Sequence, residues 1–402
     1  MEDQFLETLS SHQTFYLNTW HFLILAVAAI LAMRVLPVGN PRAWLLAIFN
    51  IYFVSYFVAD LASAIALVVI LVVSFLLGKL RLYWSDSSPT WFFALIVFSL
   101  WIILFFIKDP ELFPWVNPFH YQPIQIIGIS YLMFRSINYV VDIEILEKHD
   151  FISFCNYMIF FPALLAGPIA RFDEFHETQN IGAADDVMPY LHRIANGCIK
   201  KFVIADNLAA IGIFAHPEYG ELSVVMLWIA VLMQLFIFYM DFSGYTDIVI
   251  GIAGLMGFHL PENFNRPFKA VNLQEFWLRW HMSMTSFIRD YIFTPLSRAF
   301  VYKMDRKWHF PLFLFLSAFT MMVIALWHAT TLGFLVFGIS HGLVLIGLQL
   351  KHKFLPHFFS GEDVFTIWSS RALTYIYISI TVSLWYHGVH GTAGIVSKMF
   401  GF

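Results

Sequence analysis

The chain has 402 residues, of which 59% are hydrophobic, 19% aromatic and only 12% charged. A soluble globular protein carries roughly a quarter charged residues, so this composition excludes an ordinary soluble domain and indicates a membrane protein. The net charge of −4 is small and gives no support to nucleic-acid binding. We therefore expect an all-α fold, a polytopic integral-membrane helical bundle.

Apolar runs long enough to cross a bilayer, which takes about 20 residues, recur along the whole chain. The clear candidates are 20–36, 43–59, 61–78, 90–107, 222–242, 310–327, 330–350 and 371–388. Weaker candidates lie near 122–140 and 152–168, and the stretches 194–215 and 244–258 are spanning, tilted or re-entrant. Together these runs predict about ten or eleven membrane segments.

Basic residues in the short loops indicate the orientation, because cytosolic loops are enriched in Lys and Arg. Arg34 and Arg42 follow the first helix and Lys79 and Arg81 the third, whereas the loops after the second and fourth carry no basic excess. This alternation predicts an extracytoplasmic N-terminus. The polar island 261–309 holds eight Lys and Arg against four Asp and Glu, a net charge of +4, and is therefore predicted to lie in the cytosol.

Within this island the sequence predicts one amphipathic helix at the cytosolic interface. Asn272 followed by Glu275 is typical of a helix start, with the acid three residues after the cap. Apolar residues then recur at three- and four-residue spacing, at Phe276, Trp280, Met284, Phe287 and Tyr291. We expect the helix to end before Pro295.

His328 is the first candidate for chemistry, because it lies within a long apolar stretch, MMVIALWHATTLGFLVFGISHG. An ionisable side chain at bilayer depth is costly and usually faces the protein interior or an aqueous cavity. Small residues follow it, which permits close helix packing. A histidine here could act as the general base on a hydroxyl that attacks a thioester. The alternative is a structural histidine that hydrogen-bonds to a neighbouring helix.

His281, in FWLRWHMSMTSFIRDY, is the second candidate. The nearby Arg279, Arg289 and Arg298 could bind the phosphates of a nucleotide-bearing donor, since the guanidinium group offers forked donors. They could equally anchor lipid headgroups.

Two further segments combine polar or helix-breaking residues with apolar runs. Asp241 and Asp247 in MDFSGYTDIVIG lie six residues apart, off a common helical face and without a third ligand, so no metal site is predicted. Pro162, Gly167 and Pro168 in FFPALLAGPIARF indicate irregular backbone, which a membrane protein tolerates only where protein covers it or it lines a cavity. No GxSxG, Walker or GxGxxG motif is present.

These motifs together resemble the membrane-bound O-acyltransferase family. FWLRWHMSMTSFIRDYIFTPL followed by ALWHATTLGFLVFGISHG is similar to the family's paired histidine signature, with His281 and His328 47 positions apart. GISYLMFRSINYVVDI, FFPALLAGPIARFDEF, GCIKKFVIADNLA and FYMDFSGYTDIVIGIAGLMGFHLPENFNRPF follow the family in order. The resemblance covers roughly residues 120–345. Within the family, these motifs are similar to those of the bacterial branch that transfers acyl groups to alginate, peptidoglycan and teichoic acid.

The resemblance implies residue roles and a domain plan. His328 matches the intramembrane catalytic histidine, and His281 matches a second position where the wider family often has Asn. A central funnel from the cytosol would reach His328, with Arg279, Trp280, Arg289 and Asp290 at the donor mouth. The chain would form one domain over 1–402, with peripheral helices over 1–118, a catalytic core over 119–345 and a C-terminal helix and tail over 346–402.

The resemblance also implies substrates, partners and a location. The donor would be an acyl-CoA, acetyl-CoA in the first instance, or a phosphopantetheinyl carrier protein from the cytosol, and no metal is expected. The acceptor would be an extracytoplasmic glycan, reached with an extracytoplasmic serine-nucleophile acyltransferase as partner, in contact with membrane lipids and without nucleic acid. The location would be the bacterial cytoplasmic (inner) membrane.

Two alternatives remain open. Ser297 and Arg298 follow Pro295 and Leu296, where acetyl-transfer members usually have a glycine pair, so D-alanyl transfer from a carrier to teichoic acid is the alternative within the family. A transporter or channel with His328 as a proton relay is the alternative from another class. Transporters often contain two related halves, and no internal repeat is visible here.

Overall fold

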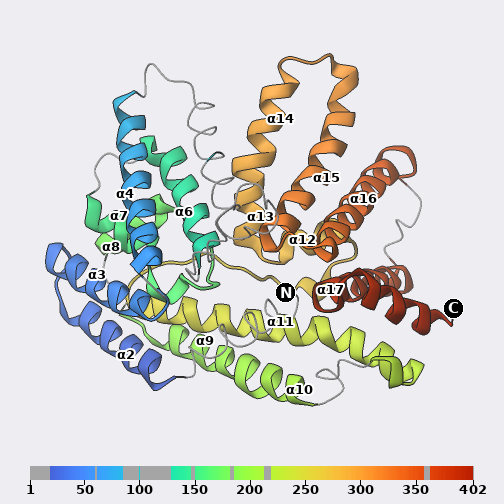
Figure 1. The fold of residues 1–402 in the computed structure, drawn as a ribbon, viewed down its shortest axis with the longest axis horizontal. Helices are drawn as coiled ribbons and strands as arrows, with labels where there is room; N and C mark the ends of the chain where they lie inside the picture. The colour runs from blue at the N-terminus through green and yellow to red at the C-terminus, as the bar shows by residue number, and fades with distance from the viewer. Residues whose placement is uncertain are drawn as a thin grey trace. The chain divides into compact units, whose positions relative to one another are not determined.

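The computed structural model describes residues 19–58, 61–84, 99, 128–145, 150–181, 185–211, 219–356 and 363–401. Within these ranges the regular structure is helical and contains no strand, and an isolated β-bridge joins Phe264 to Trp280. The predicted all-α fold is therefore confirmed. The helices are drawn in Figure 1.

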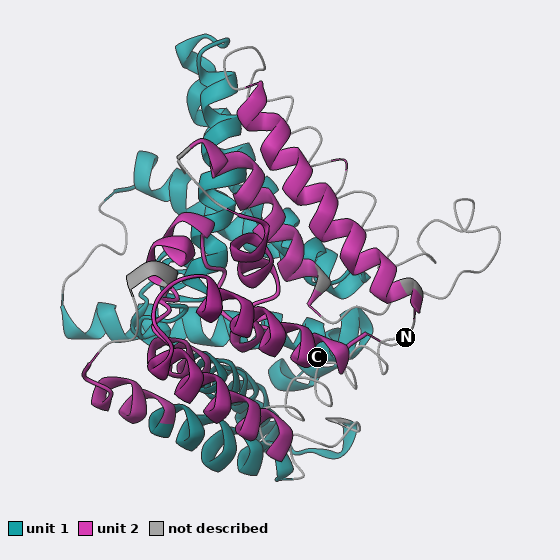
Figure 2. Cartoon of the chain, turned by 90° about the vertical axis from the view of Figure 1, so that its left-hand side faces the viewer, with its two compact units in different colours: residues 1–8, 195–246, 262–402 teal, residues 9–194, 247–261 magenta. Residues whose placement is uncertain are grey.

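The chain divides into two compact units, coloured in Figure 2. Unit 1 comprises residues 1–8, 195–246 and 262–402, and unit 2 comprises residues 9–194 and 247–261. Two of the unit boundaries fall inside helices, α9 (Met188–Cys198) and α11 (Val224–Leu255), and chain segments far apart in sequence build each unit. The single domain with parts 1–118, 119–345 and 346–402 stays a prediction.

Unit 2 holds the N-terminal helices. They are α2 (Trp20–Val35), α3 (Asn40–Ser55), α4 (Leu61–Tyr83), α6 (Ile129–Asp142), η2 (Ile143–Ile145), α7 (Phe151–Met158), η3 (Phe161–Ala163) and α8 (Phe172–Ile181). The predicted span 90–107 lies outside the described residues. Three of the predicted runs, 20–36, 43–59 and 61–78, correspond to α2, α3 and α4.

Unit 1 holds the candidate site. Its short elements are η4 (Ile199–Ala205), α10 (Asp206–Ala210), η5 (Tyr219–Glu221), η6 (Pro267–Lys269), α12 (Leu273–Arg279), α13 (Met282–Ile288), η7 (Arg289–Phe293), α14 (Thr294–Val301) and η8 (Arg306–Trp308). Its long C-terminal helices are α15 (His309–His328), α16 (Leu332–Phe354) and α17 (Val364–Phe400). Among the described residues, four helical segments are long and apolar enough to span a membrane, namely 63–83, 224–255, 306–328 and 332–354.

The predicted runs 222–242 and 244–258 are one helix, α11, of 32 residues. The separation was wrong because the acidic residues near the junction of the two runs have partners within the protein. Asp241 pairs with Lys201, and Asp247 pairs with Arg193 at 3.1 Å. Gly244 lies where α11 approaches the backbone at Gly197 and Lys201, so no side chain interrupts the contact.

The irregular backbone predicted from FFPALLAGPIARF is confirmed. α7 ends at Met158, one short 3-10 turn follows, and residues 164–171 are not helical, yet residues 156–170 are all buried. Arg135 of α6 donates to the carbonyl oxygens of Tyr157 at 2.9 Å, Met158 at 2.7 Å and Ala163 at 2.9 Å. The guanidinium group thus satisfies carbonyls that have no helical partner, as buried irregular backbone requires.

Some basic residues attributed to loops are anchors inside unit 2. Arg42 is buried and donates to the carbonyl oxygen of Met256 at 2.6 Å, directly after the end of α11. Arg34 reaches the Leu255 carbonyl at 3.5 Å. A cation at a helix C-terminus is favourable because the last carbonyls lack helical donors. Positive charge at these positions therefore serves packing within unit 2.

The predicted amphipathic helix over 272–294 begins as expected but is not one helix. The helix is interrupted at Trp280 and His281. Helical structure then resumes and continues through α13, the π-helical turn η7 and α14 to Val301. The predicted end before Pro295 was wrong because this proline follows a π-helical turn, a local adjustment that accommodates proline within a helix. Of the predicted apolar face, Phe276, Trp280, Met284 and Phe287 are buried and Tyr291 is half-buried.

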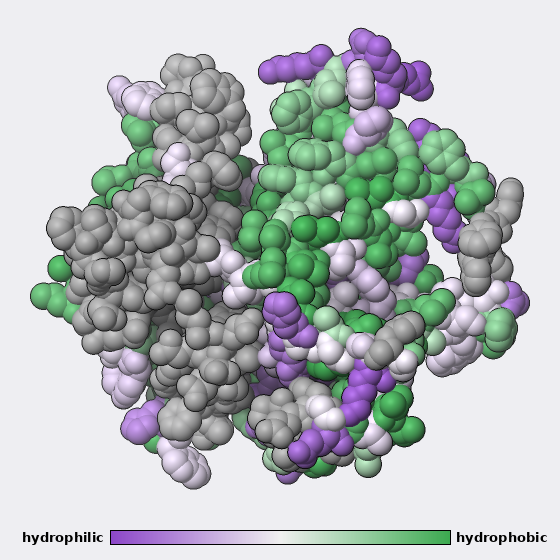
Figure 3. Space-filling model, turned by 45° about the vertical axis from the view of Figure 1, so that its right-hand side comes forward, coloured by the Kyte–Doolittle hydropathy of each residue, from purple (hydrophilic) through white to green (hydrophobic). Residues whose placement is uncertain are grey.

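α13, η7 and α14 form a hairpin with α15, as Figure 1 shows. Phe293 and Phe313 meet across it, with ring centroids 5.5 Å apart. Residues 282–301 extend for about 30 Å at the α-helical rise, so His281 and His328 lie at the same end of the hairpin and residues 302–308 at the other. Figure 3 shows hydrophilic residues gathered at that far end, above a broad hydrophobic surface. The polar island 261–309 was predicted to lie wholly in the cytosol, but the hairpin separates its two ends by about the thickness of a bilayer core.

Candidate active site

His281 occupies the break between α12 and α13. Its backbone is left-handed, with φ 44° and ψ 52°, a region that non-glycine residues rarely adopt. Such conformations persist only where the surroundings enforce them, and they cluster at functional sites. The side chain is 3% exposed.

Residues 263–265 form the hydrogen bonds that stabilise the interruption between α12 and α13. The Met282 amide donates to the Asn263 carbonyl at 2.9 Å, and the Asn265 amide donates to the Arg279 carbonyl at 2.9 Å. The Ser283 hydroxyl also donates to the side-chain oxygen of Asn263 at 2.5 Å. These bonds replace helical ones on both sides of His281, so the ENFN loop (residues 262–265) fixes the histidine's backbone.

The imidazole of His281 lies in an aromatic environment. Its ring centroid is 5.0 Å from Phe242 and 6.5 Å from Trp327. Among the described residues its Nε2 atom has no hydrogen-bond partner. Burial, and secondarily the charge of the neighbouring His328, lower the pKa of His281 to about 3, so the ring is neutral at physiological pH.

His328 is the last residue of α15. Its Nδ1 lies 2.8 Å from the carbonyl oxygen of Ile324, one helical turn earlier. The ring contacts Trp327 at 4.5 Å, stacks on Trp385 at 5.4 Å and stacks on Phe334 at 5.9 Å. Two aromatic walls and the two histidines thus meet at the same end of the hairpin.

The bond to Ile324 determines which tautomer His328 adopts. A carbonyl oxygen only accepts, so Nδ1 must carry the proton. In the neutral ring the basic lone pair is then on Nε2. This arrangement orients the imidazole and prepares Nε2 to accept a proton, as a general base does.

His341 is a buried histidine of α16 that we did not single out from the sequence. Trp277 Nε1 donates to its Nδ1 at 3.2 Å, and its Nε2 lies 2.9 Å from the hydroxyl of Thr381. Thr381 donates its own proton to the Ile378 carbonyl at 3.0 Å, so His341 Nε2 is the donor toward it. His341 therefore joins α12, which precedes His281, to α16 and α17. His341 could have been recognised in the sequence as an ionisable residue within an apolar segment.

Lys201 is a second residue missed from the sequence. Its side chain is 1% exposed and pairs with Asp241 of α11 and, at 3.0 Å, with Asp206. Lys201 lies in the π-helical turn η4, so the ion pairs join this irregular element to α11. Asp241 directly precedes Phe242, the residue that packs on His281. A lysine within GCIKKFVIADNLA, followed by an acid at 206, was the available signal.

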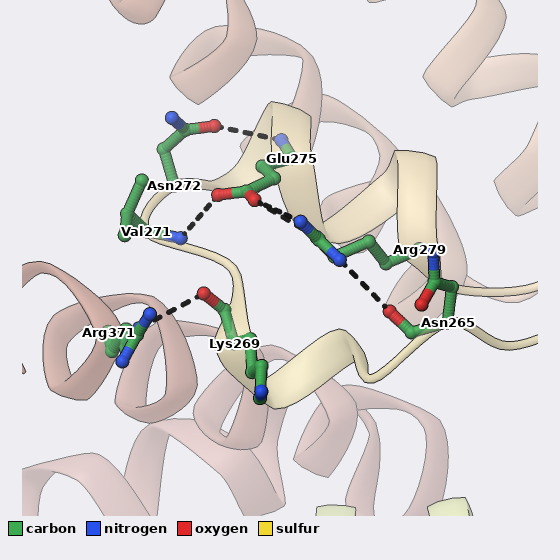
Figure 4. A network of polar contacts seen from close by, with 7 residues as sticks. All are labelled: Asn265, Lys269, Val271, Asn272, Glu275, Arg279 and Arg371. Carbon is green, nitrogen blue, oxygen red and sulfur yellow. Dashed lines mark hydrogen bonds and ion pairs between the residues drawn. The ribbon is translucent and has the colours of Figure 1, made fainter.

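Arg279 belongs to the polar network in Figure 4. Its Nε and Nη2 donate to Glu275 Oε1 at 3.0 and 2.7 Å, and its Nη1 donates to the Asn265 carbonyl at 3.3 Å. Glu275 also accepts from the Val271 amide at 2.8 Å, and its own amide donates to the Asn272 side chain at 2.8 Å. The predicted helix start is therefore confirmed.

The electrostatics of this network favour a charged Glu275. Partial burial opposes ionisation, but the bonds from Val271 and Arg279 outweigh it and lower the pKa of Glu275. Arg371 of α17 donates to the Lys269 carbonyl at 3.1 Å on the other side of the loop (Figure 4). The network ties residues 265–272 to α12 and α17.

The other predicted donor-site residues differ in exposure: Trp280 is buried and Arg289 is exposed. Trp280 is buried among aromatic rings, at 5.0 Å from Phe264 and 5.2 Å from Phe276. Arg289 has a side chain that is 60% exposed and pairs with Asp290 at 2.8 Å. A phosphate at Arg289 would meet an accessible guanidinium group, whereas one at Arg279 would compete with Glu275. Donor binding by these residues stays a prediction.

Comparison with known proteins gives several matches. The profile of the MBOAT, membrane-bound O-acyltransferase family, matches residues 48–385. The probable alginate O-acetylase AlgI of Pseudomonas aeruginosa is 36% identical over 233 residues, 54% of this chain and 42% of the relative. The peptidoglycan O-acetyltransferase of Helicobacter pylori is 34% identical over 200 residues, 48% of this chain and 37% of the relative.

A longer match is with the teichoic acid D-alanyltransferase of Bacillus subtilis, 27% identical over 374 residues, 84% of this chain and 91% of the relative. The chain spans less than half the length of the alginate and peptidoglycan relatives described above. The family profile covers most of the chain and includes both His281 and His328. The chain therefore belongs to the membrane-bound O-acyltransferase family, as its ordered motifs predicted.

Proposed function

We propose that this protein is a multi-pass membrane O-acyltransferase that uses His328 as its general base. The observation that carries the proposal is the hydrogen bond from His328 Nδ1 to the Ile324 carbonyl, which leaves the basic lone pair on Nε2. Family membership supports the reaction class.

The chemistry asked of His328 is modest. A thioester is already activated, and the base need only remove the proton of the attacking hydroxyl. The thiolate that leaves then takes the proton from the imidazolium. His281, neutral and buried beside it, acts in this proposal as a second polar group of the same site.

We propose acetyl from acetyl-CoA as the group transferred and a hydroxyl of an extracytoplasmic glycan as the acceptor, in the bacterial cytoplasmic membrane. Relatives named for alginate and peptidoglycan acetylation support this choice. A separate extracytoplasmic acyltransferase with a serine nucleophile would complete the transfer. D-alanyl transfer from a carrier protein is the second candidate, favoured by the match that covers most of both chains.

The two donors predict different ligands for the purified protein. CoA needs cationic phosphate contacts such as Arg289, whereas a carrier protein needs a protein-docking surface. We expect CoA to raise the melting temperature and the Arg289→Gln substitution to reduce that increase. Stabilisation by a phosphopantetheinylated carrier and not by CoA would favour D-alanyl transfer instead.

Mass spectrometry of cell-surface glycans tests the function. The host strain lacking this protein is complemented with wild type or with His328→Ala. We expect O-acylation to return only with wild type while both proteins reach the membrane in equal amounts. Normal acylation with His328→Ala would overturn the assignment.

A further inference from the structure

Trp385 of α17 forms one wall of the site around His328. The two rings stack with centroids 5.4 Å apart and planes within 30° of each other. Trp385 also stacks on Phe334 at 5.3 Å and contacts Phe337 at 5.0 Å. Aromatic neighbours on several sides fix the position of the indole relative to the imidazole.

The backbone around Trp385 is specialised. Gly388, three residues later, has φ 60° and ψ −171°, a conformation essentially restricted to glycine that kinks α17. Gly333 of α16 approaches so closely that a Cβ atom there would lie 2.5 Å from the carbonyl oxygen of Leu384. Two glycines thus place the helix turn that carries Trp385 against α16, at the histidine.

The indole N–H of Trp385 belongs to the buried polar groups that lack a protein partner in the described part of the chain. Nε1 is buried and has no hydrogen-bond partner among the described residues. Burying a donor without an acceptor costs free energy, so such groups are rare and often mark a functional role. The indole nitrogen only donates, so the group that it could serve is an acceptor.

We propose that Trp385 is a further catalytic residue, whose indole N–H donates a hydrogen bond to the thioester carbonyl oxygen as negative charge develops there. The inference rests on the proposed acyl transfer. It explains why a donor without a protein acceptor is kept beside the general base. Preorganised donors of this kind stabilise tetrahedral intermediates of acyl transfer.

The acceptor hydroxyl oxygen bonds to the thioester carbonyl carbon while its proton moves to His328 Nε2. The carbonyl π electrons move to the oxygen, which accepts the hydrogen bond from Trp385. When the carbonyl re-forms, the C–S bond breaks and the thiolate takes the proton from His328.

Removal of the N–H at constant ring shape tests the proposal. Trp385→Phe keeps an aromatic wall, and 3-benzothienylalanine at position 385 keeps the bicyclic ring but replaces N–H by sulfur. Trp228→Phe is the matched control, because the Trp228 indole already donates to the Met399 carbonyl at 3.2 Å, in a cluster with Leu227 and Ile395. Acyl transfer by the purified full-length variants is measured as kcat and KM.

We expect both changes at position 385 to lower kcat by about 10²- to 10³-fold with KM nearly unchanged, the range for loss of one oxyanion donor. Trp228→Phe should retain the wild-type kcat. Wild-type kcat in the benzothienylalanine variant would overturn the role of Trp385 and leave the acyl transfer intact. Absence of acyl transfer by the wild-type protein would instead refute the proposed function.

Discussion

At the scale of single residues, the two histidines differ in what fixes them. His328 ends a regular helix, and a bond to its own preceding turn selects its tautomer. His281 lies in a left-handed conformation that the ENFN loop imposes from outside. For His328 a side-chain hydrogen bond determines the tautomer, whereas for His281 the surroundings determine the backbone conformation.

Substitutions at position 281 separate backbone strain from side-chain loss. A left-handed conformation costs an alanine roughly 1–2 kcal/mol, and glycine carries no such penalty. We expect His281→Gly to be more stable than His281→Ala by about 1 kcal/mol, the reverse of the order in a helix interior. Thermal unfolding of the two detergent-solubilised variants measures the difference. An alanine variant more stable than the glycine variant would show that the left-handed conformation is not required.

The lowered pKa of His281 predicts a pH-dependent stability. Burial holds the folded pKa near 3, below the value of about 6.5 in the unfolded chain. The unfolded state therefore binds one more proton between these values, and stability falls as the pH drops below 6.5. We expect a loss of about 1.4 kcal/mol between pH 7.5 and 5.5 that the His281→Asn variant lacks. Equal losses in both proteins would contradict a buried neutral histidine.

At the scale of elements, Gly244 controls how α11 packs on the η4 region. A Cβ atom there would lie 2.7 Å from the Lys201 amide nitrogen and 2.8 Å from the Gly197 carbonyl oxygen. Backbone atoms cannot move aside as a side chain can, so we expect Gly244→Ala to destabilise the protein by about 1–3 kcal/mol. Gly347→Ala in α16 is the control, because nothing lies within 4 Å of its added Cβ. Similar melting temperatures for the two variants would refute this packing.

Elements also show what the sequence could predict. Hydropathy located α4, α15 and α16, because an apolar run of this length has few other structures in a bilayer. The Asn272 cap was visible because its partner Glu275 lies three residues away. The break at His281 was not, since the apolar spacing continues through it and the bonds that open the helix come from residues 263–265.

The candidate site could also be predicted only in part: the two histidines were identified from the sequence, and Trp385 was not. His328 was visible as an ionisable group in an apolar run, and the family signature paired it with His281. Trp385 could not be predicted from the sequence, because no feature of the sequence distinguishes it from the other tryptophans. It is one of 13 tryptophans, and only the kink at Gly388 and the packing of α16 bring it to His328.

At the scale of the whole molecule, the orientation in the membrane is open to direct test. The far end of the α14–α15 hairpin carries exposed Lys303, Arg306 and Lys307, which the positive-inside rule assigns to the cytosol. We expect Lys307→Cys to react with a membrane-impermeant maleimide in inside-out vesicles and not in intact cells. Wild type, which contains Cys155 and Cys198, gives the background. Labelling in intact cells would reverse the predicted orientation.

The central claim is that His328 Nε2 takes the proton of the attacking hydroxyl. The most direct measurement is the single-turnover rate of labelled acetyl transfer from acetyl-CoA to a glycan acceptor by the protein reconstituted together with its extracytoplasmic partner acyltransferase. The His328→Gln variant keeps a polar side chain without a base, and we expect its rate to fall by about 10²- to 10⁴-fold, the usual contribution of a general base. Gly347→Ala should match wild type. A His328→Gln variant with the wild-type rate would contradict the account.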